Sequence, residues 1–163
     1  MAVRHFSTSF LNNIAKAGGA SIADTLANCV IGFYDGSMPT NADATEGVAN
    51  LLFLVTLSSG AFTGGVGTNG LNFDVATAGI LYKAVGEVWS GVGLAAASTG
   101  TVTTWCRIYD NSYTTGADTT SARIDLDVGS GTGSGASVSL GSTTIVEGAT
   151  TTLDNANIPL LFT

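Results

Sequence analysis

The sequence predicts an all-β protein, an antiparallel β-sandwich or barrel-like domain with a short N-terminal helical segment. Beyond residue 28 the apolar residues form short runs of strand length. Clusters of Gly, Ser, Thr and Asn separate these runs at nearly regular intervals, as in sandwiches and barrels. Strands and helices do not alternate along the chain, so a parallel α/β sheet is not expected.

The predicted helical segment covers residues 9–27. Ser9 is a candidate cap for its first turn, because a serine hydroxyl can accept from the free N–H groups there. Gly18-Gly19 interrupts the segment. Ser21 can then begin a second short turn, with Ile22 and Leu26 on one side of it.

The remaining apolar runs predict strands. Residues 51–57 are almost continuously apolar, so both faces of this strand are expected to be covered. In residues 122–128 apolar positions alternate with Arg123, Asp125 and Asp127, which is typical of a half-buried strand with its polar side chains in water. Glu147-Gly148 is expected to be a hairpin turn. The predicted strands are residues 29–34, 51–57, 80–90, 101–109, 122–128, 137–140, 143–146, 150–154 and 158–162.

The chain length fits one domain. The 163 residues are enough to bury a core without help, and no composition shift marks a boundary. Residues 1–8 are expected to form an N-terminal arm, and residues 9–163 a single β-rich domain whose first part, 9–27, is helical.

The composition favours a surface that contacts other proteins. Charged residues make up only 10% of the chain, against about a quarter in average proteins. A surface with few charges is poorly protected against association. The alternative is a monomer coated in Thr and Ser.

The charges also bear on the class of partner. The net charge is −7, and the five basic residues are scattered, so direct nucleic-acid binding is not expected. No apolar run has the length of a membrane span, and the N-terminus lacks the pattern of a signal peptide. We therefore expect neither a nucleic-acid nor a membrane partner.

The residues that usually bind metals are few. Cys29 and Cys106 are far apart in the chain, and His5 is the sole histidine, so no zinc spacing is present. Both cysteines lie in apolar strand-like runs and are expected to be buried free thiols, with a disulfide as the alternative. No cofactor and no metal ligand is predicted.

No catalytic residue is predicted, and the chain is not expected to be an enzyme. A hydrolytic triad needs a well-held base, and His5 lies near the N-terminus. Asp125 and Asp127 could form the carboxylate pair of a glycosidase. A solvated strand face beside Arg123 is the interpretation that we favour for these carboxylates.

The stretch from Phe33 to Gly47 is acidic and rich in turn residues. Asp35, Asp43 and Glu46 do not have the spacing of a helix–loop–helix calcium site. The ordinary interpretation is a surface loop that leads into the apolar run at Leu51. A cation site stays open as an alternative.

Several motifs follow one another along the chain: Phe33-Tyr34-Asp35-Gly36, Pro39, Ala42-Asp43, Leu52 to Leu57, "WCRIYDN" (105–111) and residues 127–153. Their order resembles that in a family of small virion proteins of tailed bacteriophages. Members have an N-terminal helical segment, a strand ending in a glycine turn, a proline, an Ala-Asp pair and an apolar strand. Later come an Arg-bearing strand and a C-terminal pattern of Asp, Gly-Val, Gly-Ala, Leu, then Ser-Thr-Thr-Ile and Gly. The resemblance implies a virion component without catalytic residues, and it leaves open whether the protein sits on the head or the tail.

The expected function is that of a capsid decoration or cement protein, which stabilises the head by binding neighbouring capsid subunits. The expected partners are the major capsid protein and copies of this chain in a homo-oligomer. The expected location is the capsid surface of the virion, after assembly in the host cytoplasm. The candidate interface residues are Phe6, Phe10, Leu11 and Ile14, although Phe10 could instead pack in its own core.

The alternative is a tail-associated or host-surface-binding virion protein. Aromatic side chains would then stack on sugars, unless the two tryptophans fill the core instead. The residues concerned are Trp89, Trp105, Tyr109 and Tyr113.

Overall fold

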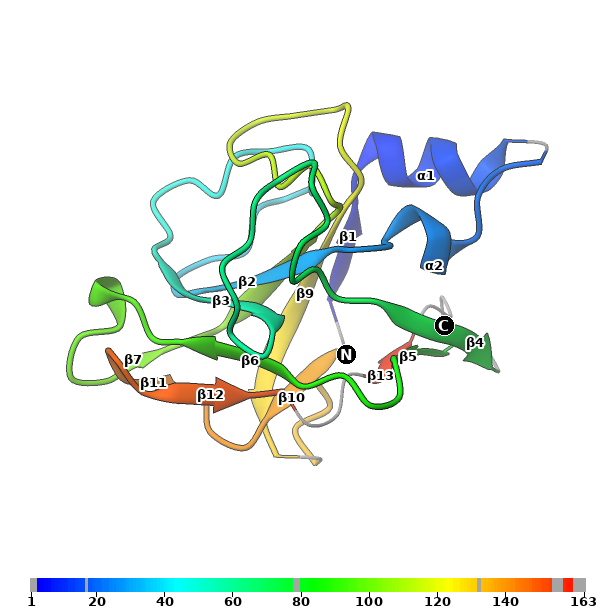
Figure 1. Cartoon of the computed structure of the whole chain (residues 1–163). Helices are drawn as coiled ribbons and strands as arrows, with labels where there is room; N and C mark the ends of the chain where they lie inside the picture. The colour runs from blue at the N-terminus through cyan, green and yellow to red at the C-terminus, as the bar shows by residue number, and fades with distance from the viewer. Residues whose placement is uncertain (1–2, 17, 78–79, 132, 154–156, 160–163) are drawn as a thin grey trace.

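The computed structural model describes residues 3–16, 18–77, 80–131, 133–153 and 157–159 (Figure 1). Its helices are α1 (Thr8–Ala15) and α2 (Ile22–Thr25), with a 3-10 turn η1 (Ala95–Ala97). The strands are β1 (Arg4–Phe6), β2 (Val30–Tyr34), β3 (Leu51–Leu57), β4 (Phe73–Thr77), β5 (Ile80–Lys83), β6 (Trp89–Val92), β7 (Thr101–Val102), β8 (Trp105–Tyr109), β9 (Arg123–Ser130), β10 (Val138–Leu140), β11 (Thr144–Ile145), β12 (Thr150–Thr152) and β13 (Asn157–Pro159). The chain is therefore mostly β, which confirms the predicted class. No helix in this part of the chain has the length and apolarity that a membrane crossing requires.

One eight-stranded sheet organises the fold. Its order is β1-β9-β8-β2-β3-β6-β12, with neighbours antiparallel, and β10 pairs with β9 in parallel. Two smaller sheets accompany it, β11-β7 and β13-β5-β4. The central strands β2, β8 and β9 are thus neighbours in space although they come from distant parts of the sequence (Figure 1).

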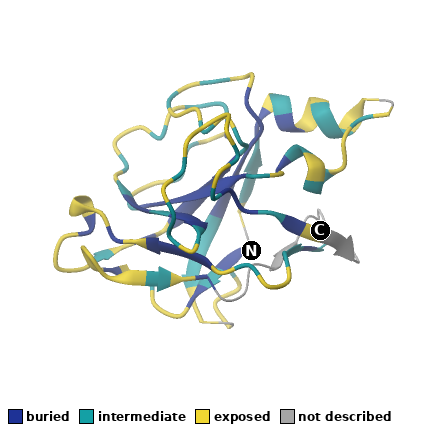
Figure 2. Cartoon of the chain, in the orientation of Figure 1, coloured by how far each residue is buried: buried dark blue, intermediate teal, exposed yellow. Residues whose placement is uncertain are grey.

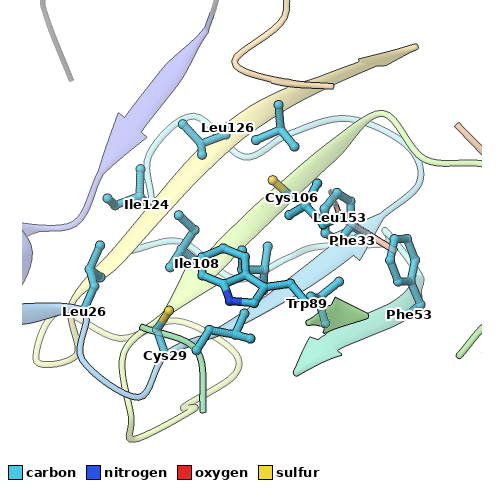
Figure 3. Close-up of a cluster of buried hydrophobic side chains, with 14 of the residues drawn as sticks. Leu26, Cys29, Phe33, Phe53, Trp89, Cys106, Ile108, Ile124, Leu126 and Leu153 are labelled. Atoms are coloured by element: carbon cyan, nitrogen blue, oxygen red, sulfur yellow. The ribbon is translucent and has the colours of Figure 1, made fainter. Parts of the chain in front are cut away.

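The hydrophobic core lies on one face of these central strands. Alternate residues of each strand point into it, and Phe33 stacks on Phe53 with ring centroids 4.5 Å apart (Figure 3). Trp89 of β6 meets Phe73 edge to face at 5.1 Å. The core residues from β2, β8 and β9 are Ile31, Phe33, Cys106, Ile108, Ile124 and Leu126.

The opposite face of the same strands is buried as well. Every residue of β2 and of β8 is buried, and Figure 2 shows the centre of the sheet in dark blue. Burial of both faces is unusual for an antiparallel sheet, which commonly leaves one face in water. Something other than the core must therefore cover the second face, and the loops between the strands do so.

Residues 4–6 belong to the predicted N-terminal arm, residues 1–8, but they pack against the sheet rather than extend from it. Residues 4–6 form β1, which pairs with β9 so that His5 lies opposite Asp125. The helical segment is two separate helices, and Ser7 rather than Ser9 caps the first, accepting from the Phe10 N–H at 3.1 Å. Ser21 begins α2 with a capping box, as its position in the sequence predicts.

Several strand boundaries differ from the prediction. Residues 80–90 form two strands, because the chain turns around Gly86, where φ is +85°. Residues 101–109 likewise divide into β7 and β8. Glu147-Gly148 does form a turn, but the strands beside it pair with β7 and β6 rather than with each other, so the predicted hairpin is wrong. The predicted strand 158–162 is described only over β13, and residues 160–162 lie outside the described residues.

The glycine-rich segment after β9 has a structural purpose. Only seven residues, 131–137, separate β9 from its parallel neighbour β10. Parallel strands usually need a crossover of a dozen residues or more. A Cβ on Gly129 would lie 2.6 Å from the Ser134 side chain, so the short return depends on a glycine there.

Truncation of Phe10 tests how firmly α1 is docked. Phe10 is 1% exposed, whereas its neighbour Leu11 is 43% exposed. We expect Phe10→Ala to lower the free energy of unfolding by about 3–5 kcal/mol, because it leaves a cavity in the core. Leu11→Ala should change it by less than about 0.5 kcal/mol. Urea denaturation of both variants measures this, and equal losses would contradict the docking described.

Candidate functional site

The second face of the sheet carries a buried ionic cluster centred on Arg107. Arg107 of β8 lies directly opposite Asp125 of β9 in the strand register. Its Nε donates to one carboxylate oxygen at 2.6 Å and its Nη2 to the other at 2.8 Å. Both side chains are fully buried. Paired in this bidentate way, the two charges are held at a fixed geometry in the interior.

This arrangement corrects the prediction for Asp125 and Arg123. Strand alternation does put them on the face away from the core, but both are fully buried rather than solvated. The period of two distinguishes the faces of a strand, and it does not tell which face water reaches. Burial raises the pKa of Asp125, while the hydrogen bonds and the positive charge of Arg107 act in the opposite direction.

Glu46 connects the loop between β2 and β3 to this cluster. Its Oε1 accepts from Arg107 Nη1 at 3.0 Å and from the Tyr109 hydroxyl at 2.7 Å, and its Oε2 accepts from the Gly116 N–H at 3.0 Å. Burial raises the pKa of this carboxyl. Hydrogen bonds from Tyr109 and from backbone N–H groups, together with the charge of Arg107, lower the pKa by more than burial raises it, so the net shift is downward. Glu46 therefore joins two loops to the central strands.

The other two carboxylates in the loop between β2 and β3 also accept hydrogen bonds. Asp35 accepts from the Asn50 N–H at 2.6 Å and from its side-chain amide at 2.9 Å. Asp43 accepts from the Thr8 N–H at 2.9 Å, at the N-terminus of α1, where a negative charge is favoured by the helix dipole. The loop is thus an ordered cover, held at both ends and in the middle. Within the described residues no group of three or more acidic, histidine or cysteine side chains could hold a metal ion.

Arg123 attaches the loop between β8 and β9. Its Nη1 donates to the Gly116 carbonyl at 2.7 Å, and its Nη2 lies 3.3 Å from an Asp118 oxygen. Its guanidinium also stands 5.8 Å from the centre of the Tyr109 ring, within the range of a cation–π contact. Hydrogen bonds from Ser121 and Thr120 hold the pKa of Asp118 well below its usual value.

Aromatic rings complete the second face. Tyr34 stacks on Trp105 at 4.5 Å, and its hydroxyl lies 2.6 Å from that of Tyr109. A Cβ on Gly32 would come within 2.9 Å of the Tyr34 ring, so a larger residue at this strand position would displace that ring. The interpretation of these aromatics as an exposed sugar-binding platform is wrong for Trp89, Trp105 and Tyr109, which are all buried. Tyr113 is half-buried.

Several side chains that could carry chemistry have contacts or burial that indicate a structural role. Both oxygens of Asp125 accept from Arg107, so the carboxylate is not held toward a cleft as a glycosidase acid would be. Both cysteines are buried free thiols, as expected, and burial raises the pKa of each. His5 lies on β1 with its Nδ1 buried and without a hydrogen-bond partner among the described residues.

The predicted interface residues do not form one exposed patch. Phe10 is in the core, and Phe6 is half-buried and stacks on Phe10 at 5.3 Å. Ile14 is half-buried against the core, and Leu11 is exposed. Phe10 therefore cannot serve as a free anchor, which agrees with the alternative that it packs in its own core.

A second surface was not singled out by the sequence analysis, and we call it the uncharged face. It consists of residues 89–104 and 143–152, where Glu147 is the one charged residue. Pairing places Val92 beside Thr150 and Val102 beside Thr144, while Thr101 and Ile145 pair on the core side. Figure 1 shows β6, β7, β11 and β12 side by side, and much of this region is exposed in Figure 2. Its exposed large apolar side chains are Val92 (43% exposed), Leu94 (42%), Val102 (52%) and Val146 (40%).

The sequence contains a signal for the buried ionic cluster and another for the uncharged face. An arginine inside the aromatic run of β8 must be paired if that strand is buried, because unpaired charges are rarely buried. The absence of charge from residues 88–105 is likewise visible in the sequence. Neither signal identifies a partner, since strand pairing between distant segments is needed to bring the residues together.

Comparisons of the chain with protein families, with curated proteins and with solved structures found no match.

Removal of the Arg107 charge tests the buried pair. We expect Arg107→Met to lower the free energy of unfolding by about 3–5 kcal/mol, because Asp125 is left buried without its counter-ion. The double variant Arg107→Met with Asp125→Leu should lose less than Arg107→Met alone, since no uncompensated charge remains. Urea denaturation at neutral pH compares the three proteins. A double variant as unstable as the single one would contradict this account.

The pKa of Glu46 predicts acid sensitivity. A carboxyl whose folded-state pKa lies below its ordinary 4.5 stabilises the fold above that pH, and this contribution is lost as the pH falls through the folded-state pKa. Wild-type stability should therefore fall below about pH 4.5, and Glu46→Gln should show a shallower fall with lower stability at pH 7. Urea midpoints between pH 7 and pH 3 measure this. Glu147→Gln, an exposed turn position, is the control and should follow the wild type.

Proposed function

We propose that this chain is a structural protein of a tailed-bacteriophage virion, a capsid decoration or cement protein that stabilises the head by binding neighbouring capsid subunits. It acts by adhesion and breaks no bonds. The observation that carries the proposal is the uncharged face, a surface with exposed valines on a chain of net charge −7. Exposed apolar area is typical of surfaces that bind other proteins, and the strands that carry or flank these valines, β6, β7 and β11, lie side by side (Figure 1).

The internal structure supports an adhesive role. The strands of the uncharged face are held by backbone pairing within the chain, β11 to β7 and β12 to β6. A surface held in this way loses less conformational entropy on binding than a flexible one. Burial of apolar surface contributes about 25 cal/mol per Å² of free energy, so a modest contact can give net affinity. A capsid repeats that contact many times.

The resemblance to small virion proteins supports the location. It rests on motifs that the structure places in β2, the loop after it, β3, β8 and the C-terminal strands. The major capsid protein and copies of this chain are the proposed partners, at the capsid surface. Leu11 is the exposed member of the N-terminal set, and we propose it, with the half-buried Ile14 and Phe6, as a contact to a neighbouring subunit.

The abundance of the chain in virions tests the proposal. We expect mass spectrometry of virions, purified from the host that carries this gene, to find the chain at a level near that of the major capsid protein. Particles that lack it should release their DNA at lower temperature and after milder salt shock than intact particles. A few copies per particle would instead indicate a tail component, and absence from virions would refute both locations.

A further inference from the structure

Two polar side chains of the second face have buried atoms without a hydrogen-bond partner. Within the described residues five buried side-chain nitrogen or oxygen atoms lack one, and three of these atoms belong to Arg123 and His5. The Arg123 side chain is fully buried. Its Nε has no acceptor, and its Nη2 lies 3.3 Å from Asp118 without the alignment of a hydrogen bond. Since most buried polar atoms bond to protein or to ordered water, these atoms require a partner.

The strand register brings the two side chains to the same place. His5 of β1 lies directly opposite Asp125 of β9, and opposite residues of an antiparallel pair direct their side chains to one face. Arg123 is two positions from Asp125 on β9, so it lies on this face too, diagonally from His5. Diagonal neighbours are about 7–8 Å apart, within reach of long side chains. Burial raises the pKa of Asp125, while charges that include those of His5 and Arg123 lower it, so both groups lie near its carboxylate.

The two unpartnered groups are chemically complementary. The Nε of Arg123 carries a hydrogen and can only donate, whereas a neutral histidine can leave Nδ1 free to accept. In the part of the chain that the structure describes, neither group bonds directly to the other. A molecule between them would therefore have to accept from Arg123 and donate to His5, and water does both.

The charges of the second face distinguish between possible occupants. Its ion pairs join two guanidinium groups to three carboxylates, so negative charge is already in excess. An anion would add to that excess in the interior, and a metal cation would lie beside the positive charge of Arg123. A water molecule adds no charge, and buried water commonly makes two to four hydrogen bonds to polar groups that would otherwise be unsatisfied.

We infer that one buried water molecule binds between β1 and β9, where it accepts a hydrogen bond from Arg123 Nε and donates one to His5 Nδ1. Its other hydrogen is directed to the Asp125 carboxylate, because each oxygen of that group accepts one bond from Arg107 and has capacity for another. His5 then carries its proton on Nε2. This water joins the N-terminal strand to the ionic cluster, and the inference does not depend on the proposed virion function.

The experiment is NMR spectroscopy of the full-length, isotope-labelled chain at about pH 8, above the range in which histidines usually titrate. His5 is the sole histidine, so the signals of its two ring nitrogens are unambiguous. The Nε–H signal of Arg123 is assigned through the side-chain carbons of that residue. Nuclear and rotating-frame Overhauser spectra then distinguish a long-lived bound water near this N–H from hydrogen exchange with solvent.

Two variants of His5 form a matched pair. His5→Asn keeps an acceptor on Cγ, where histidine has Nδ1, and His5→Leu removes the acceptor at similar size. We expect the wild type to have an unprotonated Nδ1, a protonated Nε2 and an Overhauser contact between Arg123 Nε–H and water. The contact should persist in His5→Asn and be lost in His5→Leu.

A proton on Nδ1 of the wild type, or the absence of its water contact, would overturn the inference. So would a contact that is unchanged in His5→Leu or lost in His5→Asn. A shift of the Arg123 Nε–H signal that follows the chloride concentration would identify an anion instead of water, and would overturn it as well. Circular dichroism checks the fold of each variant, and if His5→Leu does not fold, the spectra of the wild type and of His5→Asn decide.

Discussion

The bidentate contact between Arg107 and Asp125 is the constraint on which the rest of the second face depends. Two ions taken out of water contribute little net stability unless their remaining hydrogen-bonding capacity is satisfied. Here Arg107 also donates to the Ala44 carbonyl and to Glu46, both from the loop between β2 and β3. The requirement to satisfy one guanidinium thus determines where that loop must lie.

The position of one loop then determines the next. Glu46, once bound to Arg107, accepts from the Gly116 N–H, and the Gly116 carbonyl accepts from Arg123. The Asp118 N–H donates to the Asp43 carbonyl at 2.9 Å, so the two loops also contact each other directly. A network of this kind specifies one arrangement, because any other leaves a buried charge without a partner. Its energetic importance therefore lies in excluding alternatives more than in net stabilisation.

The sequence predicts local features of this fold well and contacts between distant segments poorly. The bounds of β3 and nearly those of β2 follow from apolar runs, and the alternation in residues 122–128 correctly assigns its residues to two faces. That Asp125 faces Arg107 depends on the pairing of β8 with β9, which no local pattern encodes. The same holds for β1, whose three residues have no strand signal of their own and gain their structure from β9. The cover loop was assigned as a loop, but the inward direction of Glu46 requires knowledge of the arginine beneath it.

The central strands and the region of β6, β7, β11 and β12 differ in their content of charge. Nearly all charged groups near the central strands bond internally, and the exposed area around β6, β7, β11 and β12 has almost none. A chain with few charges would normally be prone to unselective association. The adhesive contact that we propose lies where charge is scarce, because a carboxylate buried in a contact without a partner costs free energy. Where the few charged residues lie on the fold therefore explains more about this chain than how many there are.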